Sequence, residues 1–335
     1  MLSEKENFLR LINHTNTRQL CNGYDMVYCR PDPVFSLDRD GVKSWEDGGN
    51  YYYVDPWGTT HVFPPNEPGP MPITTQEYKV ISDITKWKEQ LSLPDYTSYE
   101  MDWSQINAEF ENCDREKQLT AVIMIIGLFE RTHYLMGFED ALVNHLLYPK
   151  EMHELLDEVL GIRIQQAKLI VEGCHPDVII HHDDWGTKSQ LFLPPDVWRE
   201  FYKERYRKLF DCFRDLGVIV IQHGDSFQEP ITNDMEEIGI KVWQGAIPEN
   251  NIPVIQEQCK ELILMGGLDM SIIDQKNQSE QVIRTEVRRA CNTYGPRGNF
   301  IPCITYGGPG AIYSGVDELI QDEINRYNME TLGQI

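Results

Sequence analysis

The sequence of 335 residues predicts an α/β protein of the (β/α)8 TIM-type barrel class. After Gln118, short runs rich in valine and isoleucine alternate with longer stretches of helical period, which is the pattern of a parallel sheet covered by helices. The runner-up, a doubly wound open sheet, is less well supported because no Gly-x-Gly-x-x-Gly turn opens a helix. No internal repeat or low-complexity linker divides the chain, so we expect residues 1–335 to form a single barrel domain.

The N-terminal third is expected to be irregular. Ser3 and Glu6 form a capping-box pattern ahead of apolar residues at helical spacing, which predicts a short first helix. Residues 19–29 are the first expected strand. From about 30 to 118 the chain is rich in proline, glycine, aspartate and tryptophan, and it predicts a long excursion packed over the barrel mouth, with room for a small hairpin.

The rest of the chain supplies the regular elements. The expected strands are 121–127, 177–182, 218–223, 240–244, 261–266 and 299–304. The expected helices cover about 130–147, 150–172, 195–216, 229–238, 251–259, 278–293 and 315–332. With the strand near residue 20 and one further strand that the pattern does not locate, these elements make up an eight-stranded barrel.

Composition excludes several classes of function. There are 53 acidic residues against 30 basic ones, a formal charge of −23, so a nucleic acid is not expected as the main partner. The longest apolar stretch, 121–129, is far shorter than the roughly 20 residues that a membrane helix needs. The start of the chain lacks the features of a signal peptide, and the eight cysteines have no paired spacing, so we expect a cytoplasmic protein with reduced thiols.

Four titratable side chains, His181-His182-Asp183-Asp184, end the strand expected at 177–182. Burying such a group at the end of an apolar strand costs folding free energy, so these side chains are expected to be solvated, paired or functional. In a strand, His182 and Asp184 share one face while His181 and Asp183 share the other, so at most two side chains point into the barrel. The alternative interpretation is a helix cap with one structural aspartate.

Two further strands deliver side chains that can bind a metal. The run Val218–Gln222 leads to His223 and, after a glycine, to Asp225; the later run 300–303 ends at Cys303. The carboxyl ends of barrel strands carry the active site, and one imidazole, one carboxylate and one thiolate suit zinc. Alternatively, His223 is a buried structural histidine and Cys303 is core packing.

Two weaker candidates complete the expected site. Tyr306 begins the turn Tyr306-Gly-Gly-Pro-Gly, whose backbone can approach a ligand closely, and its hydroxyl can donate a proton or only pack. Asp25 can close the site from the first strand or can be a solvated turn residue.

Several of these segments resemble the uroporphyrinogen decarboxylase superfamily. The resemblance runs through most of residues 119–332, and one further matching segment, Asp55-Pro-Trp-Gly58, lies before this range. Within the range, the matching segments are Phe129-Glu-Arg-Thr-His-Tyr-Leu-Met-Gly-Phe-Glu139, His182-Asp-Asp-Trp-Gly-Thr187, Leu193-Pro-Pro-Asp-Val-Trp-Arg-Glu-Phe201 and Gly266-Gly-Leu-Asp269. The resemblance implies the barrel fold. The N-terminal Arg-Gln-Ala-Gly-Arg stretch of the decarboxylase is missing, which argues against a porphyrinogen with eight carboxylates as substrate.

The other major branch of the superfamily is the corrinoid-dependent methyltransferases. The resemblance to its coenzyme M members places His223 and Cys303 at two zinc ligands, whereas Asp225 stands where those relatives carry a cysteine. A carboxylate in place of a thiolate makes the ion harder and more Lewis acidic. The coenzyme M members transfer a methyl group from cobalt to a thiol. The carboxylate suits transfer in the opposite direction, from a methyl ether to cobalt, because the poor leaving group of an ether needs a metal or a general acid.

The resemblance therefore implies a methyltransferase that moves a methyl group from a small methoxylated, aromatic donor to the cob(I)alamin of a partner corrinoid protein. Zinc is expected at His223, Asp225 and Cys303, and a general acid among His182, Asp183 and Tyr306. Donor contacts are expected from Asp25, Trp57, Phe129, Tyr134 and Trp185, although the aromatic residues can equally be core. The alternatives are a methylcobalamin:thiol methyltransferase, a decarboxylase-like enzyme and a non-catalytic tetrapyrrole-binding barrel. Monomer and homodimer both remain open.

Overall fold

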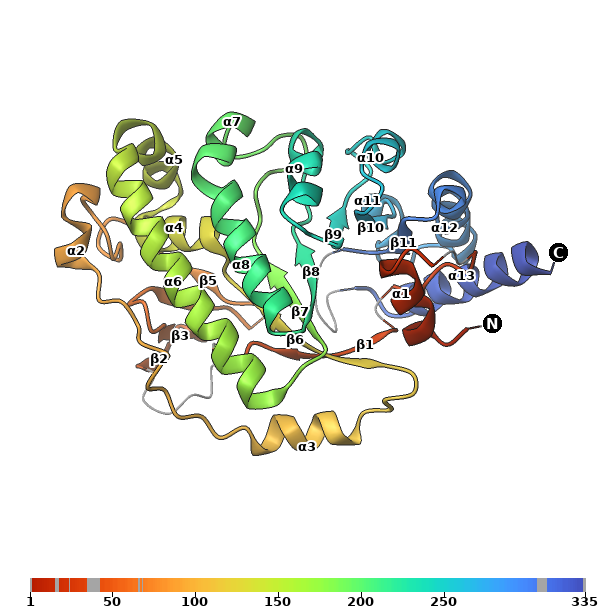
Figure 1. The fold of residues 1–335 in the computed structure, drawn as a ribbon, viewed down its shortest axis with the longest axis horizontal. Coiled ribbons are helices and arrows are strands. Elements are labelled where there is room, and N and C mark those ends of the chain that lie inside the picture. Colours follow the sequence, from red (N-terminus) through yellow and green to blue (C-terminus); the bar gives the residue numbers. More distant parts are fainter. Residues whose placement is uncertain are drawn as a thin grey trace.

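The central element of the fold is a curled parallel sheet of seven strands (Figure 1). The computed structural model describes residues 2–15, 18–23, 25–34, 43–65, 67, 69–305 and 312–333. The strands lie side by side in sequence order: β1 (Val27–Pro31), β6 (Leu119–Met124), β7 (Val178–His182), β8 (Ile219–His223), β9 (Val242–Ala246), β10 (Ile263–Gly267) and β11 (Phe300–Cys303). This order, with helices in the crossovers, gives the sheet a TIM-like arrangement.

The closed eight-stranded barrel expected from the sequence is not seen in the described residues, where β1 and β11 are the two edges of the sheet. The first strand begins at Val27, later than expected, because the backbone of Leu20 forms its hydrogen bonds with a side chain instead of a neighbouring strand. Leu20 donates its N–H to Asn328 Oδ1 at 2.8 Å and accepts a hydrogen bond from Asn328 Nδ2 at 2.9 Å. A side chain of the last helix thus takes the place of a strand partner.

Helices flank the sheet, and the expected ones are present with changed boundaries. The helix expected at about 130–147 is divided into two helices at Gly137, whose φ of +87° lies in the left-handed region that favours glycine. The helix expected at 195–216 contains a five-residue π-helical segment, 199–203. The helices are α1 (Glu4–Ile12), α2 (Trp87–Gln90), α3 (Ser104–Asn112), α4 (Leu128–Met136), α5 (Phe138–Leu147), α6 (Pro149–Cys174), α7 (Pro195–Trp198), α8 (Glu204–Asp215), α9 (Thr232–Glu237), α10 (Ile252–Gln258), α11 (Met270–Ile273), α12 (Glu280–Tyr294) and α13 (Val316–Leu332), with 3-10 turns at Ile84–Lys86, Glu229–Ile231 and Gly295–Arg297.

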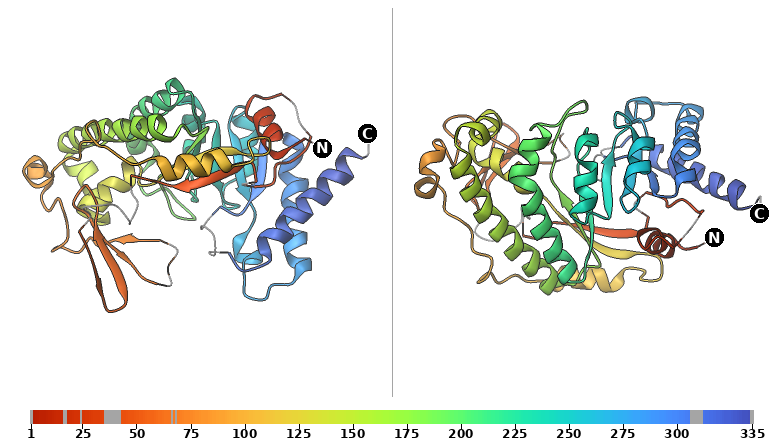
Figure 2. Two further views of the ribbon diagram at one scale, coloured as in Figure 1. Left: turned by 90° about the horizontal axis from the view of Figure 1, so that it is seen from below. Right: turned by 45° about the horizontal axis from the view of Figure 1, so that its top comes forward.

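The segment expected to be irregular contains a second sheet. Its four antiparallel strands are β2 (Ser44–Asp47), β3 (Asn50–Val54), β4 (Thr60–Phe63) and β5 (Met71–Pro72), in that order. The sheet projects from the body of the molecule (Figure 2, left). Tyr53 pairs with His61 in the register of β3 and β4, so their side chains share one face of this sheet.

The interior of the curled sheet is packed with apolar side chains from all seven strands, among them Val27, Ala121, Ile180, Ile221 and Ile301. These residues alternate along their strands with residues that face the surrounding helices. In β7 and β8 the apolar residues Ile180 and Ile221 are followed two positions later by His182 and His223, which end the strands. This change from apolar to polar side chains marks the place of the site. Among the described residues, none of the helices is both long enough and apolar enough to cross a bilayer.

Candidate metal centre and adjacent cavity

Three side chains converge where β7 and β8 end: His182, Asp184 and His223. His182 and His223 are paired in the register of the two strands, so both project to the same face. Each of the three residues offers a ligand atom, and these atoms lie within 4.8 Å of one another. Among the described residues, these three are the histidine, cysteine and acidic residues whose ligand atoms lie this close together as a group. Two imidazoles and a carboxylate form a ligand set that zinc accepts.

Neighbouring residues fix both imidazole rings. Glu130 Oε2 lies 3.0 Å from His182 Nδ1, and Gln244 Oε1 is in hydrogen-bond contact with His223 Nδ1. Glu130 belongs to the first turn of α4, directly after β6, and Gln244 is paired with His223 across β8 and β9. With Nδ1 engaged on each ring, Nε2 remains as the ligand atom, as in many histidine–metal sites with an outer carboxylate or carbonyl partner.

The electrostatics of the group are strongly perturbed. Burial disfavours the charged form of His182, but the Glu130 carboxylate outweighs burial and raises the pKa of His182 to about 10. Burial and the neighbouring His182 lower the pKa of His223 to about 3. Burial also raises the pKa of Asp184 to about 7, against the opposing charge of His182. Shifts of this size are typical of functional sites, and a bound cation would reverse those of His182 and Asp184.

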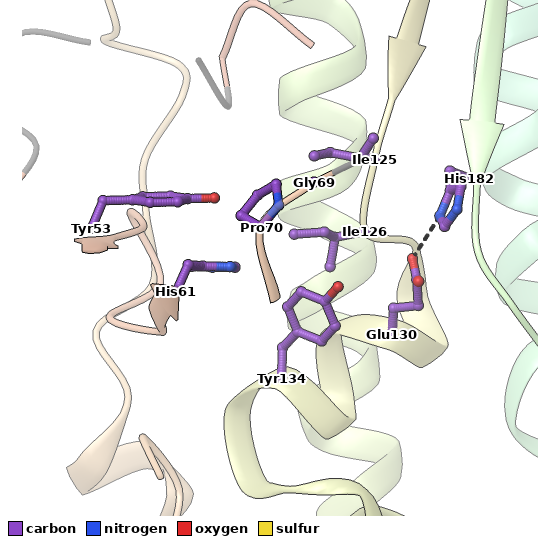
Figure 3. A pocket seen from close by; sticks show the side chains of 9 residues that line it. All are labelled: Tyr53, His61, Gly69, Pro70, Ile125, Ile126, Glu130, Tyr134 and His182. Atoms are coloured by element: carbon purple, nitrogen blue, oxygen red, sulfur yellow. Dashed lines mark hydrogen bonds and ion pairs between the residues drawn. The ribbon is translucent and has the colours of Figure 1, made fainter. Parts of the chain in front are cut away.

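A cavity of about 240 Å³ opens beside this group (Figure 3). The hydrogen-bonded pair of Glu130 and His182 forms one end, and Tyr53 and His61 of the antiparallel sheet form the other. The remaining lining residues are Gly69, Pro70, Ile125, Ile126 and Tyr134. Tyr53 stacks on His61, with ring centroids 4.6 Å apart and planes at 8°, and Tyr134 meets His61 edge-on at 5.7 Å. The cavity is therefore mainly aromatic and apolar, with one polar end.

A buried ion pair connects the antiparallel sheet to helix α4. Arg131 Nη1 lies 2.8 Å from Asp55 Oδ2, and neither side chain is more than 1% exposed. Asp55 also accepts N–H groups from Trp57 and Thr59 and contacts His61 Nε2 at 3.2 Å. Burial opposes ionisation of Asp55, but the Arg131 charge prevails and lowers its pKa. The Asp-Pro-Trp-Gly segment thus positions the start of β4, the strand that carries His61.

Three predicted site residues lie in the packing around the cavity. The Trp57 ring lies 4.7 Å from the Arg131 guanidinium carbon and does not line the cavity. Phe129 packs against Phe192, with ring centroids 5.6 Å apart. Trp185 is buried, and its indole N–H donates to Tyr206 Oη at 3.0 Å. Of the aromatic residues expected at the donor, Tyr134 is the one that lines this cavity.

Asp183 faces away from the metal group. It is fully buried and accepts the backbone N–H groups of Phe129 and Glu130 at 3.0 and 2.9 Å, and it also accepts the hydroxyl of Tyr206. These two N–H groups belong to the first turn of α4 and have no partner within the helix. This geometry corresponds to the helix-cap alternative for the strand-end cluster, and it gives Asp183 a positioning role for Glu130.

The predicted set of His223, Asp225 and Cys303 is not brought together as one group. Asp225 is half-buried, and its charge acts on Asp184, so it lies beside the metal group. Cys303 lies in the apolar interior of the sheet, where the backbone of Gly23 packs against it, and burial raises its pKa far above the usual range. Strand stagger explains the difference, because equal positions at strand ends do not lie at equal depth in a barrel.

The other two candidates lie elsewhere. Asp25 precedes β1 and is therefore at the amino end of that strand, where it accepts a hydrogen bond from Gln321 Nε2 at 3.1 Å. Burial and the charge of Asp317 raise its pKa. Tyr306 falls outside the described residues.

Sequence reasoning missed Glu130, Gln244, Tyr53 and His61 as parts of the site. Glu130 follows β6 within a few residues, and the position after a barrel strand is a signal that could have found it. Gln244 is a polar residue in an otherwise apolar strand, which is a weaker signal of the same kind. Tyr53 and His61 come from an irregular segment whose sheet register no local pattern fixes.

Comparisons with known proteins agree with this architecture. The sequence profile of the uroporphyrinogen decarboxylase family (URO-D) matches residues 112–307. The chain belongs to this family. Among solved structures, a methyltransferase from Methanosarcina mazei superposes with a TM-score of 0.64 at 13% identity, covering 98% of this chain and 99% of that one. This likeness concerns the fold.

A second solved structure, described as a sugar phosphate isomerase/epimerase from Anabaena variabilis, reaches a TM-score of 0.37 at 11% identity, covering 72% of this chain and 85% of that one. No curated protein matches the sequence significantly.

Proposed function

We propose that this URO-D family protein is a cytoplasmic methyltransferase that moves a methyl group from a small methoxylated aromatic donor to the cob(I)alamin of a partner corrinoid protein. The observation that carries the proposal is the group of His182, Asp184 and His223, of which His182 lines one end of a mainly aromatic and apolar cavity. The likeness in fold to a methyltransferase supports it. Pockets for drug-sized ligands measure roughly 300–1,000 Å³, so a cavity of about 240 Å³ suits a single ring better than a porphyrinogen.

The residues fit a zinc ion. The buried Oδ1 of Asp184 has no hydrogen-bond partner among the described residues, and a buried carboxylate oxygen without a partner is costly unless a cation compensates it. His182 and His223 present Nε2 on the same side, held by Glu130 and Gln244. Bound there, zinc would supply the Lewis acidity that stabilises negative charge on the leaving oxygen of a methyl ether.

The remaining residues orient the donor. Tyr134, Ile125 and Ile126 enclose the ring between the aromatic end and the polar end. Displacement at a methyl carbon requires the attacking and leaving groups to be in line, so a cavity that fixes the ring accelerates transfer by orientation. Glu130 holds His182 in place through Nδ1, and Asp183 holds the first turn of α4, which carries Glu130.

The test is methyl transfer by the purified protein from a panel of methoxyarenes to a reduced corrinoid protein. We expect transfer by the wild type, and at least a hundred-fold loss in His223→Ala and Asp184→Asn, as is common for metal ligands and their supports. His175→Asn changes an exposed histidine at the end of α6 and should leave the rate unchanged. Thiol methylation from methylcobalamin without any transfer from methoxyarenes would instead support the reverse direction.

A further inference from the structure

The Tyr53 hydroxyl is a polar group at the aromatic end of the cavity without an assigned role. Tyr53 is 3% exposed and lines the cavity, and its hydroxyl points into the cavity toward Pro70 (Figure 3). Within the described residues this hydroxyl makes no hydrogen bond. Burial raises its pKa, so the oxygen keeps its proton and can donate as well as accept.

The ring that carries this hydroxyl is held rigidly. Tyr53 stacks on His61 at 4.6 Å, and His61 is fixed by Asp55, which is itself paired with Arg131. A hydroxyl on a buried and rigidly held ring discriminates between ligands that satisfy its hydrogen bond and ligands that leave it unpaired.

The two ends of the cavity define the spacing of groups on a ligand. Glu130 and His182 lie at the end next to the metal group, and Tyr53 lies at the opposite end (Figure 3). A single aromatic ring whose methoxy oxygen faces His182 therefore directs its far side, the position para to the methoxy group, toward Tyr53.

We propose that Tyr53 is a specificity-determining residue that recognises a hydrogen-bonding substituent, such as a hydroxyl, para to the methoxy group of the donor. This inference rests on the proposed function for the class of donor. It makes the antiparallel sheet, and not the barrel strands, the part of the fold that selects among methoxyarenes.

Calorimetric titration of the zinc-loaded protein with methoxybenzene, 4-methoxyphenol and 2-methoxyphenol tests the proposal. A neutral hydrogen bond of about 1 kcal/mol corresponds to about five-fold in affinity. We expect the wild type to bind 4-methoxyphenol about five-fold more tightly than methoxybenzene, with a smaller gain for 2-methoxyphenol. Tyr53→Phe should abolish the gain for 4-methoxyphenol.

Two variants serve as controls. Tyr52→Phe changes the adjacent residue of β3, which stacks on Trp45 on the opposite face of the sheet, and it should keep the gain. Tyr134→Phe removes the other tyrosine hydroxyl of the cavity wall and should keep it too. The proposal is overturned by an equal gain in Tyr53→Phe, by loss of the gain in Tyr134→Phe, by an equal gain for the two isomers, or by no binding of any ether. Normal binding without methyl transfer would instead contradict the proposed function alone.

Discussion

The imidazole rings of His182 and His223 stack on each other, with centroids 4.5 Å apart and planes at 20°. The arrangement follows from their paired positions on two neighbouring parallel strands. Two imidazolium ions at this distance would repel each other, and the low pKa of His223 keeps that ring neutral. A neutral imidazole is the form that binds a metal.

The first prediction concerns which residues hold zinc. We expect His223→Ala to lower the zinc content of the purified protein to a small fraction of one ion per chain, because it removes one ligand of three. Cys303→Ala should keep the wild-type content, because Cys303 packs in the apolar interior. Elemental analysis after dialysis measures both. Loss of zinc from both variants would return the ligand set to His223, Asp225 and Cys303, as expected from the sequence, and retention of zinc in His223→Ala would contradict both ligand sets.

The sheet was predictable from Leu119 onward because each strand there is a short β-branched run followed by a helix of regular period. The region before it was not. Whether residues 19–26 form a strand depends on Asn328, about 300 residues away, and the sheet at 44–72 depends on cross-strand pairs such as Tyr53 with His61. Such long-range pairing leaves no local period.

The site was predictable only as far as strand alternation reaches. Alternation places His182 and Asp184 on one face, and the structure brings them together with His223. The relative depth of Cys303 depends on the stagger between strands, which the sequence does not display. Gln244 and Glu130 become recognisable only after the strands are aligned.

The second prediction tests the close packing of Asp183 beneath α4. A Cβ atom on Gly127 would lie 2.2 Å from Asp183 Cγ, and Asp183 cannot yield without losing its hydrogen bonds to α4. We expect Gly127→Ala to lower the free energy of unfolding by about 1–3 kcal/mol. Gly161→Ala, in α6 with no atom within 4 Å of the added Cβ, should raise it by about 0.5–1 kcal/mol. Urea denaturation compares them, and a stabilised Gly127→Ala would contradict the packing.

The third prediction concerns the buried pair of Asp55 and Arg131. Removing one partner of a buried ion pair leaves an uncompensated charge, at a cost of about 3–5 kcal/mol. We therefore expect Asp55→Ala to reduce the free energy of unfolding by about this amount. Glu6→Ala breaks a pair with Arg10 in which both side chains are about half exposed, and it should cost less than about 1 kcal/mol. Equal changes in the free energy of unfolding for the two variants would show that the buried pair stabilises the fold no more than the exposed pair does.

The fourth prediction is a pH dependence that arises at His145, away from the metal group. His145 is 2% exposed, and its ring nitrogens contact Ala141 O at 2.6 Å and Tyr202 Oη at 2.8 Å. Burial lowers its pKa to about 4, against the opposing hydrogen bond to Ala141. An unfolded histidine has a pKa of about 6.5, so between about pH 6.5 and 4 the unfolded state binds a proton that the folded state does not.

This histidine therefore contributes stability above pH 6.5 that is lost as the pH falls toward 4, by at most about 1.4 kcal/mol per pH unit. The measurement is the free energy of unfolding in urea, from pH 7.5 to 4.5, with a chelator present to remove bound metal. His145→Gln removes the titrating group, so its stability should fall less steeply with decreasing pH than that of the wild type, whatever its value at pH 7.5. His175→Asn, at an exposed position, should keep the wild-type slope. Because other buried histidines also titrate, the difference in slope between these two variants isolates His145, and parallel curves would mean that the pKa of His145 is the same in the folded and unfolded states.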